Sequence, residues 1–164
     1  MNNLVVVSNS TPIILLQKIG QLELFQKLYS KIYIAKAVYR EVIIDGFEKV
    51  NQDDFISKYN WIKIVDIKNI EARKIFAASL HSGEVETMIL AMEQFADLCI
   101  LDDLLARKYA KRFDLNVTGT LGVLVAAKKK RLIKDVKSII NQLMDVGMFI
   151  GNDLYDIILS IADE

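Results

Sequence analysis

Residues 83–103 read GEVETMILAMEQFADLCILDD, and this stretch decides the predicted fold. Its first half places apolar side chains at the spacing i, i+3, i+4, i+7, at Val85, Met88, Ile89 and Met92. That spacing predicts an amphipathic helix, with Ser82 as its N-terminal cap. The apolar run at 98–101 is typical of a strand buried on both faces. A helix that leads into such a strand indicates an α/β protein.

The same alternation of strand and helix extends along the rest of the chain. Further strands are predicted at residues 4–7, 32–34 and 61–65, the last as an edge strand, and around Val117. A helix should begin at Thr11 as cap and Pro12 as first helical residue, and end at Gly20. Other helices are predicted at 22–28, 35–44, 70–78, 103–113, 119–130, 135–146 and 153–161. This order predicts an α/β fold with a central, mostly parallel sheet covered by helices on both faces.

Length and composition suit one domain. The chain has 164 residues, 52% of them hydrophobic, and a single proline. No linker, low-complexity tract or internal repeat interrupts it. We therefore expect a single domain over residues 1–164, with a core at 4–133 and C-terminal helices at 134–164.

The composition also excludes several kinds of site. Cys99 is the only cysteine, which excludes a disulfide scaffold and a cysteine-based zinc site. The only histidine, His81, leaves little room for a histidine-centred metal site. The longest apolar run, residues 121–127, is far shorter than the roughly 20 residues of a membrane span, and there is no N-terminal signal pattern. We expect a soluble, cytoplasmic protein.

Acidic and amide side chains fall where predicted strands end or helices begin. They are Asn9, Glu41, Glu84, Asp102 and Asp103. The carboxyl ends of parallel strands converge on one edge of a sheet, where sites are normally built. Oxygen ligands there suit Mg²⁺ or Mn²⁺, and clustered carboxylates repel one another unless a divalent cation balances them. The pattern indicates a metal-dependent phosphoryl-transfer site, with the four carboxylates around the metal.

Each of these side chains also has an ordinary structural explanation. Asn9 suits an Asx-type turn, and Glu41 borders an apolar helical stripe as many surface glutamates do. Glu84 and Glu86 lie in a first helical turn, where the helix dipole favours acids. Asp103 can cap the next helix, which explains one of the two adjacent aspartates but not both.

Four segments together resemble the PIN-domain nucleases: VVVSNSTPIILLQKIGQLELF (5–25), IYIAKAVYREV (32–42), LHSGEVETMILAMEQFADLCILDD (80–103) and VTGTLGVLVAAKKKRLI (117–133). The resemblance covers residues 4–133, is closest to the VapC-like toxin ribonucleases, and is most specific at 83–103. It implies a three-layer α/β/α PIN-like fold that uses Mg²⁺ or Mn²⁺ to cleave RNA.

The resemblance also implies roles for individual residues. Glu41, Glu84 and Asp102 match the family's acids, with Asp103 beside the last. Asn9 stands where the family normally has an aspartate, and it completes the implied catalytic set of Asn9, Glu41, Glu84 and Asp102. An amide supplies an oxygen but no charge and no general base, so this site would hold its metal more weakly. The turn at 118–120 matches a strand-to-helix junction near the family's site.

Positive charge is concentrated in one part of the chain. The formal net charge is zero, yet residues 104–131 carry eight basic residues against one aspartate, a local charge of +7. Four of them belong to a predicted helix and could contact an RNA backbone: Arg107, Lys108, Lys111 and Arg112. The basic run at residues 128–131 is equally well explained as a solvated helix end, where the macrodipole favours positive charge.

The favoured hypothesis is a Mg²⁺- or Mn²⁺-dependent endoribonuclease, the toxin of a toxin–antitoxin module. Its expected partners are RNA, a small antitoxin protein and a second copy in a homodimer. The alternative is a PIN-fold RNA- or protein-binding module whose catalysis is weakened at Asn9. A Mg²⁺-dependent phosphatase or phospho-receiver ranks last, because such proteins need an acid directly after the first strand, where this chain has Ser8 and Asn9.

Overall fold

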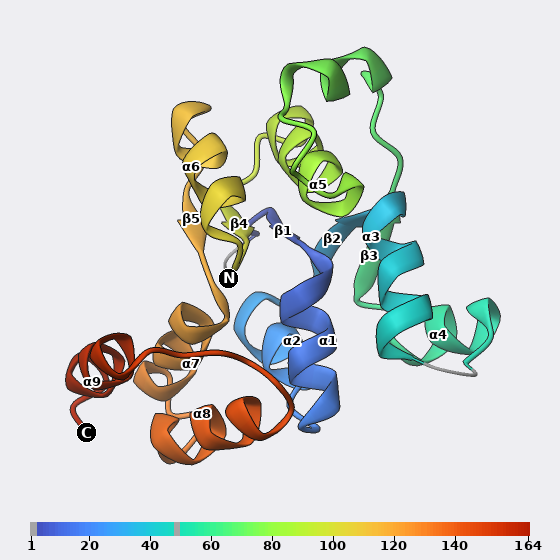
Figure 1. Ribbon diagram of the computed structural model, residues 1–164. Coiled ribbons are helices and arrows are strands. Elements are labelled where there is room, and N and C mark those ends of the chain that lie inside the picture. Colours follow the sequence, from blue (N-terminus) through green and yellow to red (C-terminus); the bar gives the residue numbers. More distant parts are fainter. Residues whose placement is uncertain (1–2, 48–49) are drawn as a thin grey trace.

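The structure, a computed structural model, describes residues 3–47 and 50–164 (Figure 1). Its centre is a five-stranded sheet in the order β3-β2-β1-β4-β5. The strands are β1 (Val6–Ser8), β2 (Ile32–Ala35), β3 (Ile62–Val65), β4 (Leu98–Ile100) and β5 (Val117–Thr118). All four pairings are parallel, and β3 is an edge strand as predicted.

Helices flank the sheet, which confirms the three-layer α/β prediction. They are α1 (Ser10–Lys18), α2 (Glu23–Tyr29), α3 (Lys36–Glu41), α4 (Gln52–Lys58), α5 (Ser82–Glu93), α6 (Leu104–Arg112), α7 (Thr120–Lys129), α8 (Val136–Asp145) and α9 (Asn152–Ile161), with a π-helical turn η1 (Val42–Gly46) and a 3₁₀ helix η2 (Ile70–Ile75). Helix α5 packs against β1, β2 and β4, while α2 packs against β2 and α7, on the other side of the sheet in Figure 1.

The core follows the apolar patterns of the sequence. Val6 and Val7 in β1 and Met88 in α5 are fully buried, and Ile89 in α5 is nearly so. Cys99 is buried in β4, and that burial raises the pKa of its thiol to about 12. Such a thiol is unreactive at neutral pH and serves as a small apolar side chain.

Several element boundaries differ from the prediction. Helix α1 begins at Ser10 with Asn9 in the cap position, not at Thr11, and the cap of α5 is His81, not Ser82. The helix predicted over 35–44 is divided into α3 and the π-helical turn η1. The segment predicted to be helical at 70–78 is the shorter 3₁₀ helix η2.

Helix α4 is absent from the prediction because its sequence has no apolar stripe. It buries one residue, Phe55, which lies within an aromatic cluster with Tyr39, Phe47 and Tyr59 at ring distances of 5.0 to 5.5 Å. Aromatic pairs at this separation stabilise packing beyond the area they bury. The tertiary contacts of Phe55 therefore stabilise α4, a helix that the local pattern of apolar residues does not predict.

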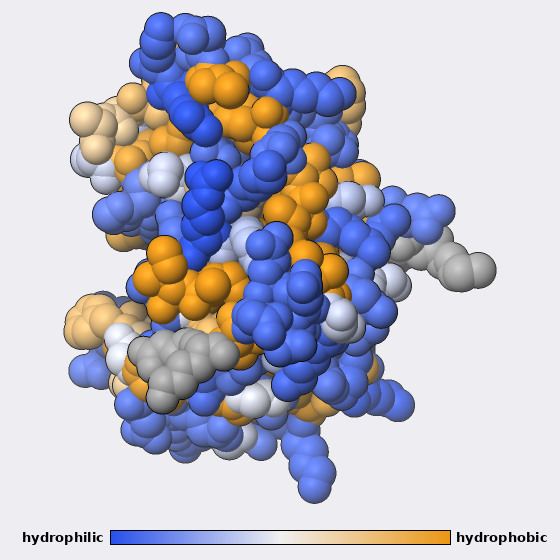
Figure 2. Space-filling model, turned by 90° about the vertical axis from the view of Figure 1, so that its right-hand side faces the viewer, coloured by the Kyte–Doolittle hydropathy of each residue, from blue (hydrophilic) through white to orange (hydrophobic). Residues whose placement is uncertain are grey.

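Figure 2 shows the face beside α4 and β3, where apolar patches are separated by charged and polar residues. Exposed isoleucines include Ile44 of η1 and Ile56 of α4. Scattered apolar side chains of this kind are normal on a protein surface. Across residues 3–47 and 50–164, no helix has the length and apolar character that crossing a bilayer requires.

Candidate active site at the carboxyl edge of the sheet

Asn9 lies directly after β1, at the edge where β1 and β4 end together. Ser8 is in register with Ile100, and the backbone N–H of Asn9 donates to the Ile100 carbonyl at 3.0 Å. The side chain of Asn9 is only 3% exposed and makes no capping bond to α1. Its Oδ1 is buried without a hydrogen-bond partner among the residues that the structure describes. A buried acceptor without a partner is costly, so this oxygen is available to a ligand.

Glu41, at the end of α3, connects three helices through its carboxylate. Ser10 Oγ of α1 donates to Oε2 at 2.5 Å, and the backbone N–H of Gly83 in α5 donates to Oε1 at 3.1 Å. A Cβ at position 83 would overlap both carboxylate oxygens. Glycine at this position therefore permits the close approach of α5 to Glu41.

Glu84 lies in the first turn of α5 and is 8% exposed. Its Oε2 accepts a hydrogen bond from the His81 N–H at 3.0 Å, which completes a capping box. Burial raises the pKa of Glu84, and the negative charges of Asp103 and Glu41 raise it further against the opposing effects of the His81 N–H and side chain. The carboxylates at this edge therefore repel one another, a repulsion that a cation would relieve.

Asp102 follows β4, and Thr120 holds its carboxylate. The Thr120 N–H donates to Oδ1 at 2.7 Å and the Thr120 hydroxyl donates to Oδ2 at 2.6 Å. A Cβ on the neighbouring Gly119 would lie 2.7 Å from Asp102 Oδ1 and 2.9 Å from Arg107 Nη1. The turn at 118–120 is therefore shaped around the Asp102 carboxylate. The sequence placed this turn near the predicted site but gave no role to Thr120, which holds Asp102.

Asp103, predicted as a metal ligand, and Glu86, which the sequence assigned only to a first helical turn, both have structural partners. Asp103 caps α6 by accepting the Ala106 N–H at 2.8 Å, as its alternative explanation predicted. Glu86 is buried and pairs with Arg73 of η2 at 2.6 Å, and it accepts the Ala37 N–H at 3.4 Å. Glu86 therefore joins α5 to η2 and α3, a role that depends on residues distant in sequence.

The predicted site residues line two neighbouring pockets. The smaller, about 290 Å³, is lined by Asn9, Ser10, Thr11, Ile14, Glu41, Asp45, His81 and Glu84. Asp102 lines a larger pocket of about 680 Å³, and Thr11 lines both. The structure thus brings Asn9, Glu41 and Glu84 together, with Asp102 in the adjoining pocket and Asp103 in neither. Within the described part of the chain, no three His, Cys, Asp or Glu side chains form a group that could hold a metal ion.

The donor chemistry of this edge fits a hard divalent cation. Asn9 Oδ1 is buried without a partner, and the adjacent Glu41 and Glu84 offer only oxygen. Each carboxylate oxygen can accept more than one bond, so the contacts of Glu41 and Asp102 leave both able to ligate. The full set of Glu41, Glu84, Asp102 and Asp103 as metal ligands stays a prediction.

Helix α6, which begins directly after Asp102 and Asp103 at this edge, carries the four predicted basic residues. Lys108, Lys111 and Arg112 are exposed, and the Arg112 guanidinium lies over the Tyr109 ring at 5.5 Å. Arg107 is half-buried and lines the larger pocket. The contact of these four residues with RNA stays a prediction.

Comparison with known proteins assigns the family. Residues 5–164 match the DUF3368 family of PIN domains, so the chain belongs to this family. Its structure is similar to a PilT N-terminus domain protein from the hyperthermophilic archaeon Sulfolobus solfataricus P2, with a TM-score of 0.57 and 17% identity over 76% of this chain and 93% of that chain. At this identity the likeness concerns the fold. No curated protein matches the chain.

Proposed function

We propose that this protein is a Mg²⁺- or Mn²⁺-dependent endoribonuclease. PIN domains are generally nucleases that use divalent metals. The observation that carries the proposal is the buried, unpartnered Oδ1 of Asn9, which shares a pocket with Glu41 and Glu84 at the carboxyl edge of the sheet.

Glu41 and Glu84 would hold the cation in the pocket that they share with Asn9, whose amide oxygen is a neutral ligand. Asp102, predicted as a further ligand, lines the adjoining pocket, and Asp103 follows it in the chain. When bound, a divalent cation activates water and balances charge on the scissile phosphate. Ser10 and Gly83 hold Glu41 in place, and Thr120 holds Asp102. These hydrogen bonds fix carboxylate orientations before any ligand arrives, which is how surrounding groups tune metal sites.

The basic helix α6 would hold the RNA backbone. Arg107, Lys108, Lys111 and Arg112 lie on the helix that begins directly after Asp102 and Asp103. Contacts to phosphates give affinity without sequence preference and make binding weaken as salt rises. We further propose a VapC-like role as the toxin of a toxin–antitoxin module, in a homodimer that a small antitoxin protein inhibits.

A second candidate is a PIN-fold RNA- or protein-binding module with weakened catalysis. The observation that favours it is Asn9 itself, because an amide removes one negative charge from the site. An RNA-binding module makes the same prediction for RNA binding as the nuclease, and either form of the module makes the opposite prediction for cleavage.

The deciding experiment is cleavage of single-stranded RNA by purified, partner-free protein in Mn²⁺, in Mg²⁺ and in EDTA. The nuclease proposal predicts cleavage in either metal, none in EDTA, and a large loss in Asp102→Asn. Asp145→Asn is the matched control, because Asp145 is exposed at the end of α8. RNA that stays intact in saturating Mn²⁺ would contradict the nuclease proposal and favour the binding module.

A further inference from the structure

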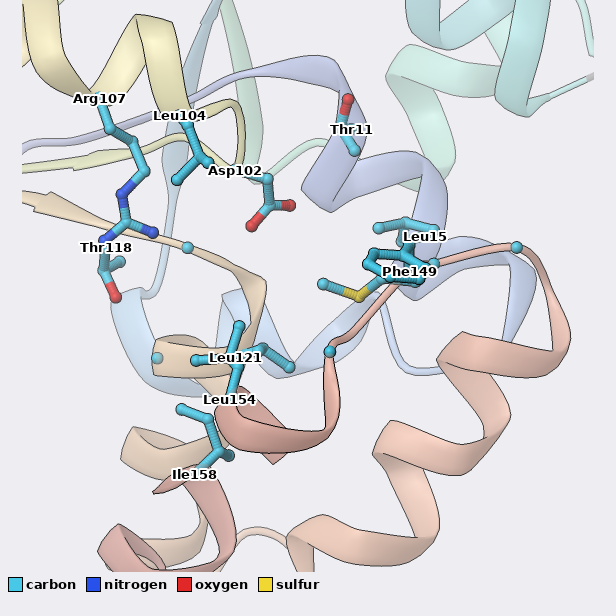
Figure 3. A pocket seen from close by; sticks show the side chains of 15 residues that line it. Thr11, Leu15, Asp102, Leu104, Arg107, Thr118, Leu121, Phe149, Leu154 and Ile158 are labelled. Atoms are coloured by element: carbon cyan, nitrogen blue, oxygen red, sulfur yellow. The ribbon is translucent and has the colours of Figure 1, made fainter. Parts of the chain in front are cut away.

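The larger pocket lies beside Asp102, between α6, α7 and the segment that joins α8 to α9 (Figure 3). Its volume of about 680 Å³ is within the range of sites that bind small molecules. In Figure 3 the Asp102 carboxylate points into this space, with Arg107 on one side and Phe149 on the other. The pocket therefore adjoins the proposed catalytic edge directly.

The two ends of the pocket differ in chemistry. Asp102, Arg107 and Thr118 form a polar end. The remaining wall is mainly aliphatic and includes Leu15, Leu121, Met148, Leu154 and Ile158. A ligand with one charged part and one flat, weakly polar part would match both ends.

Phe149 lies at the edge of the pocket, and its ring is almost entirely exposed to solvent. It is 92% exposed, although it belongs to the pocket lining. An exposed ring next to an apolar wall is a surface on which a planar group can stack. Nothing in the packing of the fold requires an aromatic residue at this position.

Arg107 supplies positive charge at the polar end. It is half-buried and forms no ion pair within residues 3–47 and 50–164. In Figure 3 its guanidinium reaches down toward Thr118. A half-buried guanidinium without a carboxylate partner is suited to a phosphate, which it can bind through two parallel hydrogen bonds.

We propose that this pocket binds one unpaired nucleotide of a single-stranded RNA, adjacent to the phosphate that is cleaved. The base enters the aliphatic cavity and stacks on Phe149, while Arg107 binds the neighbouring phosphate. This inference rests on the proposed function, because it takes RNA as the substrate. It favours single strands as the substrate, since a base within a duplex must first be unpaired and unstacked, at a cost in free energy, before it can enter a pocket.

Charge and shape favour a nucleotide over an apolar protein segment as the occupant. A purely apolar segment would cover the charged groups of Arg107 and Asp102 and offer neither a polar partner, which is costly. Lys108, Lys111 and Arg112 are exposed on the same helix as Arg107, and their added positive charge suits a polyanion.

Binding in EDTA tests the proposal without any cleavage. The probes are a fluorescently labelled single-stranded RNA dodecamer, the same sequence as a duplex, and an abasic ribose-phosphate chain of equal length. Phe149→Ala should weaken binding of the single strand about tenfold and leave the abasic chain unaffected. Arg107→Gln should weaken binding of both chains. Phe95→Ala is the matched control, because Phe95 is 89% exposed and lines none of the described pockets.

The outcomes separate this inference from the proposed function. Asp102-dependent cleavage, together with single-strand binding that Phe149→Ala does not change, overturns the nucleotide pocket alone. Binding that depends on Phe149, without cleavage in Mn²⁺, supports the pocket and overturns the nuclease. Hydrogen exchange at residues 147–151 should slow with the single strand. Slowing only with a protein partner would make this a protein-docking site and overturn the proposal.

Discussion

Thr120 donates one hydrogen bond to each carboxylate oxygen of Asp102, from its backbone N–H at 2.7 Å and from its hydroxyl at 2.6 Å. Thr120 is fully buried, so its position is fixed by the packing of α7. These two hydrogen bonds connect Asp102, which follows β4, to the first residue of α7. The orientation of Asp102 is therefore a property of the fold and requires no ligand.

The hydroxyl of Thr120 should therefore contribute to activity through Asp102. Thr120→Val keeps the shape but removes one donor, and we expect a loss of roughly 10- to 100-fold in cleavage or metal affinity. The free energy of unfolding should fall by about 1 kcal/mol. Thr120→Ser, which keeps the hydroxyl, is the control. Equal activity of the valine and serine variants would show that the hydroxyl does not position Asp102.

Gly83 should tolerate no side chain, because a Cβ would overlap the Glu41 carboxylate. We expect Gly83→Ala to destabilise the fold by about 1–3 kcal/mol and to displace Glu41 from the site. Gly151→Ala is the control, since Gly151 has a φ of −68° and open space around its Cβ position, and its effect should stay below about 1 kcal/mol. Denaturant unfolding of both variants measures the difference, and equal values would contradict the close contact.

Glu164 should make stability depend on pH through the start of α8. Its carboxylate accepts hydrogen bonds from the N–H groups of Val136 and Lys137 and pairs with Lys128. Burial alone would raise the pKa of Glu164, but these contacts together lower it below the ordinary value of 4.5. The carboxylate therefore stabilises the fold above about pH 4.5, and the contribution is lost as the pH falls through the lowered pKa.

The comparison of wild type with Glu164→Gln isolates this contribution. The variant should have a lower Tm at neutral pH, and the difference should shrink as the solution is acidified below pH 4.5. A difference that persists unchanged in acid would assign the effect to packing instead of charge.

Asn9→Asp should increase both the metal affinity and the cleavage rate, because it places a negative charge beside Glu41 and Glu84. In EDTA the same variant should have a lower Tm than wild type, since it buries a further carboxylate among acids. Mn²⁺ should then raise its Tm by more than it raises that of wild type. Thermal unfolding with and without Mn²⁺ measures this, and equal metal-induced shifts would place the metal away from Asn9.

The sequence predicted those features that depend on local pattern. Short apolar runs marked β1 and β4, the spacing of Met88 and Ile89 marked α5, and strand ends marked Asn9 and Asp102. The helix cap at Asp103 was also predicted, because capping depends on residues close in sequence.

Features that depend on contacts between distant segments were not predictable. Phe55 holds α4 through aromatic partners outside the helix, and Glu86 is buried because Arg73 of another element pairs with it. The separation of Asp102 from Glu41 into adjoining pockets depends on how the first turn of α1 lies between them. No spacing in a single sequence reports such an arrangement.

The proposed metal site is tested most directly by the position of Mn²⁺ in crystals of the protein, located by anomalous diffraction. We expect a strong anomalous peak at the carboxyl edge of the sheet, within coordinating distance of Asn9 Oδ1 or of the Glu41, Glu84 and Asp102 carboxylates. Peaks found only at acids elsewhere on the surface would contradict the metal site and the nuclease that depends on it.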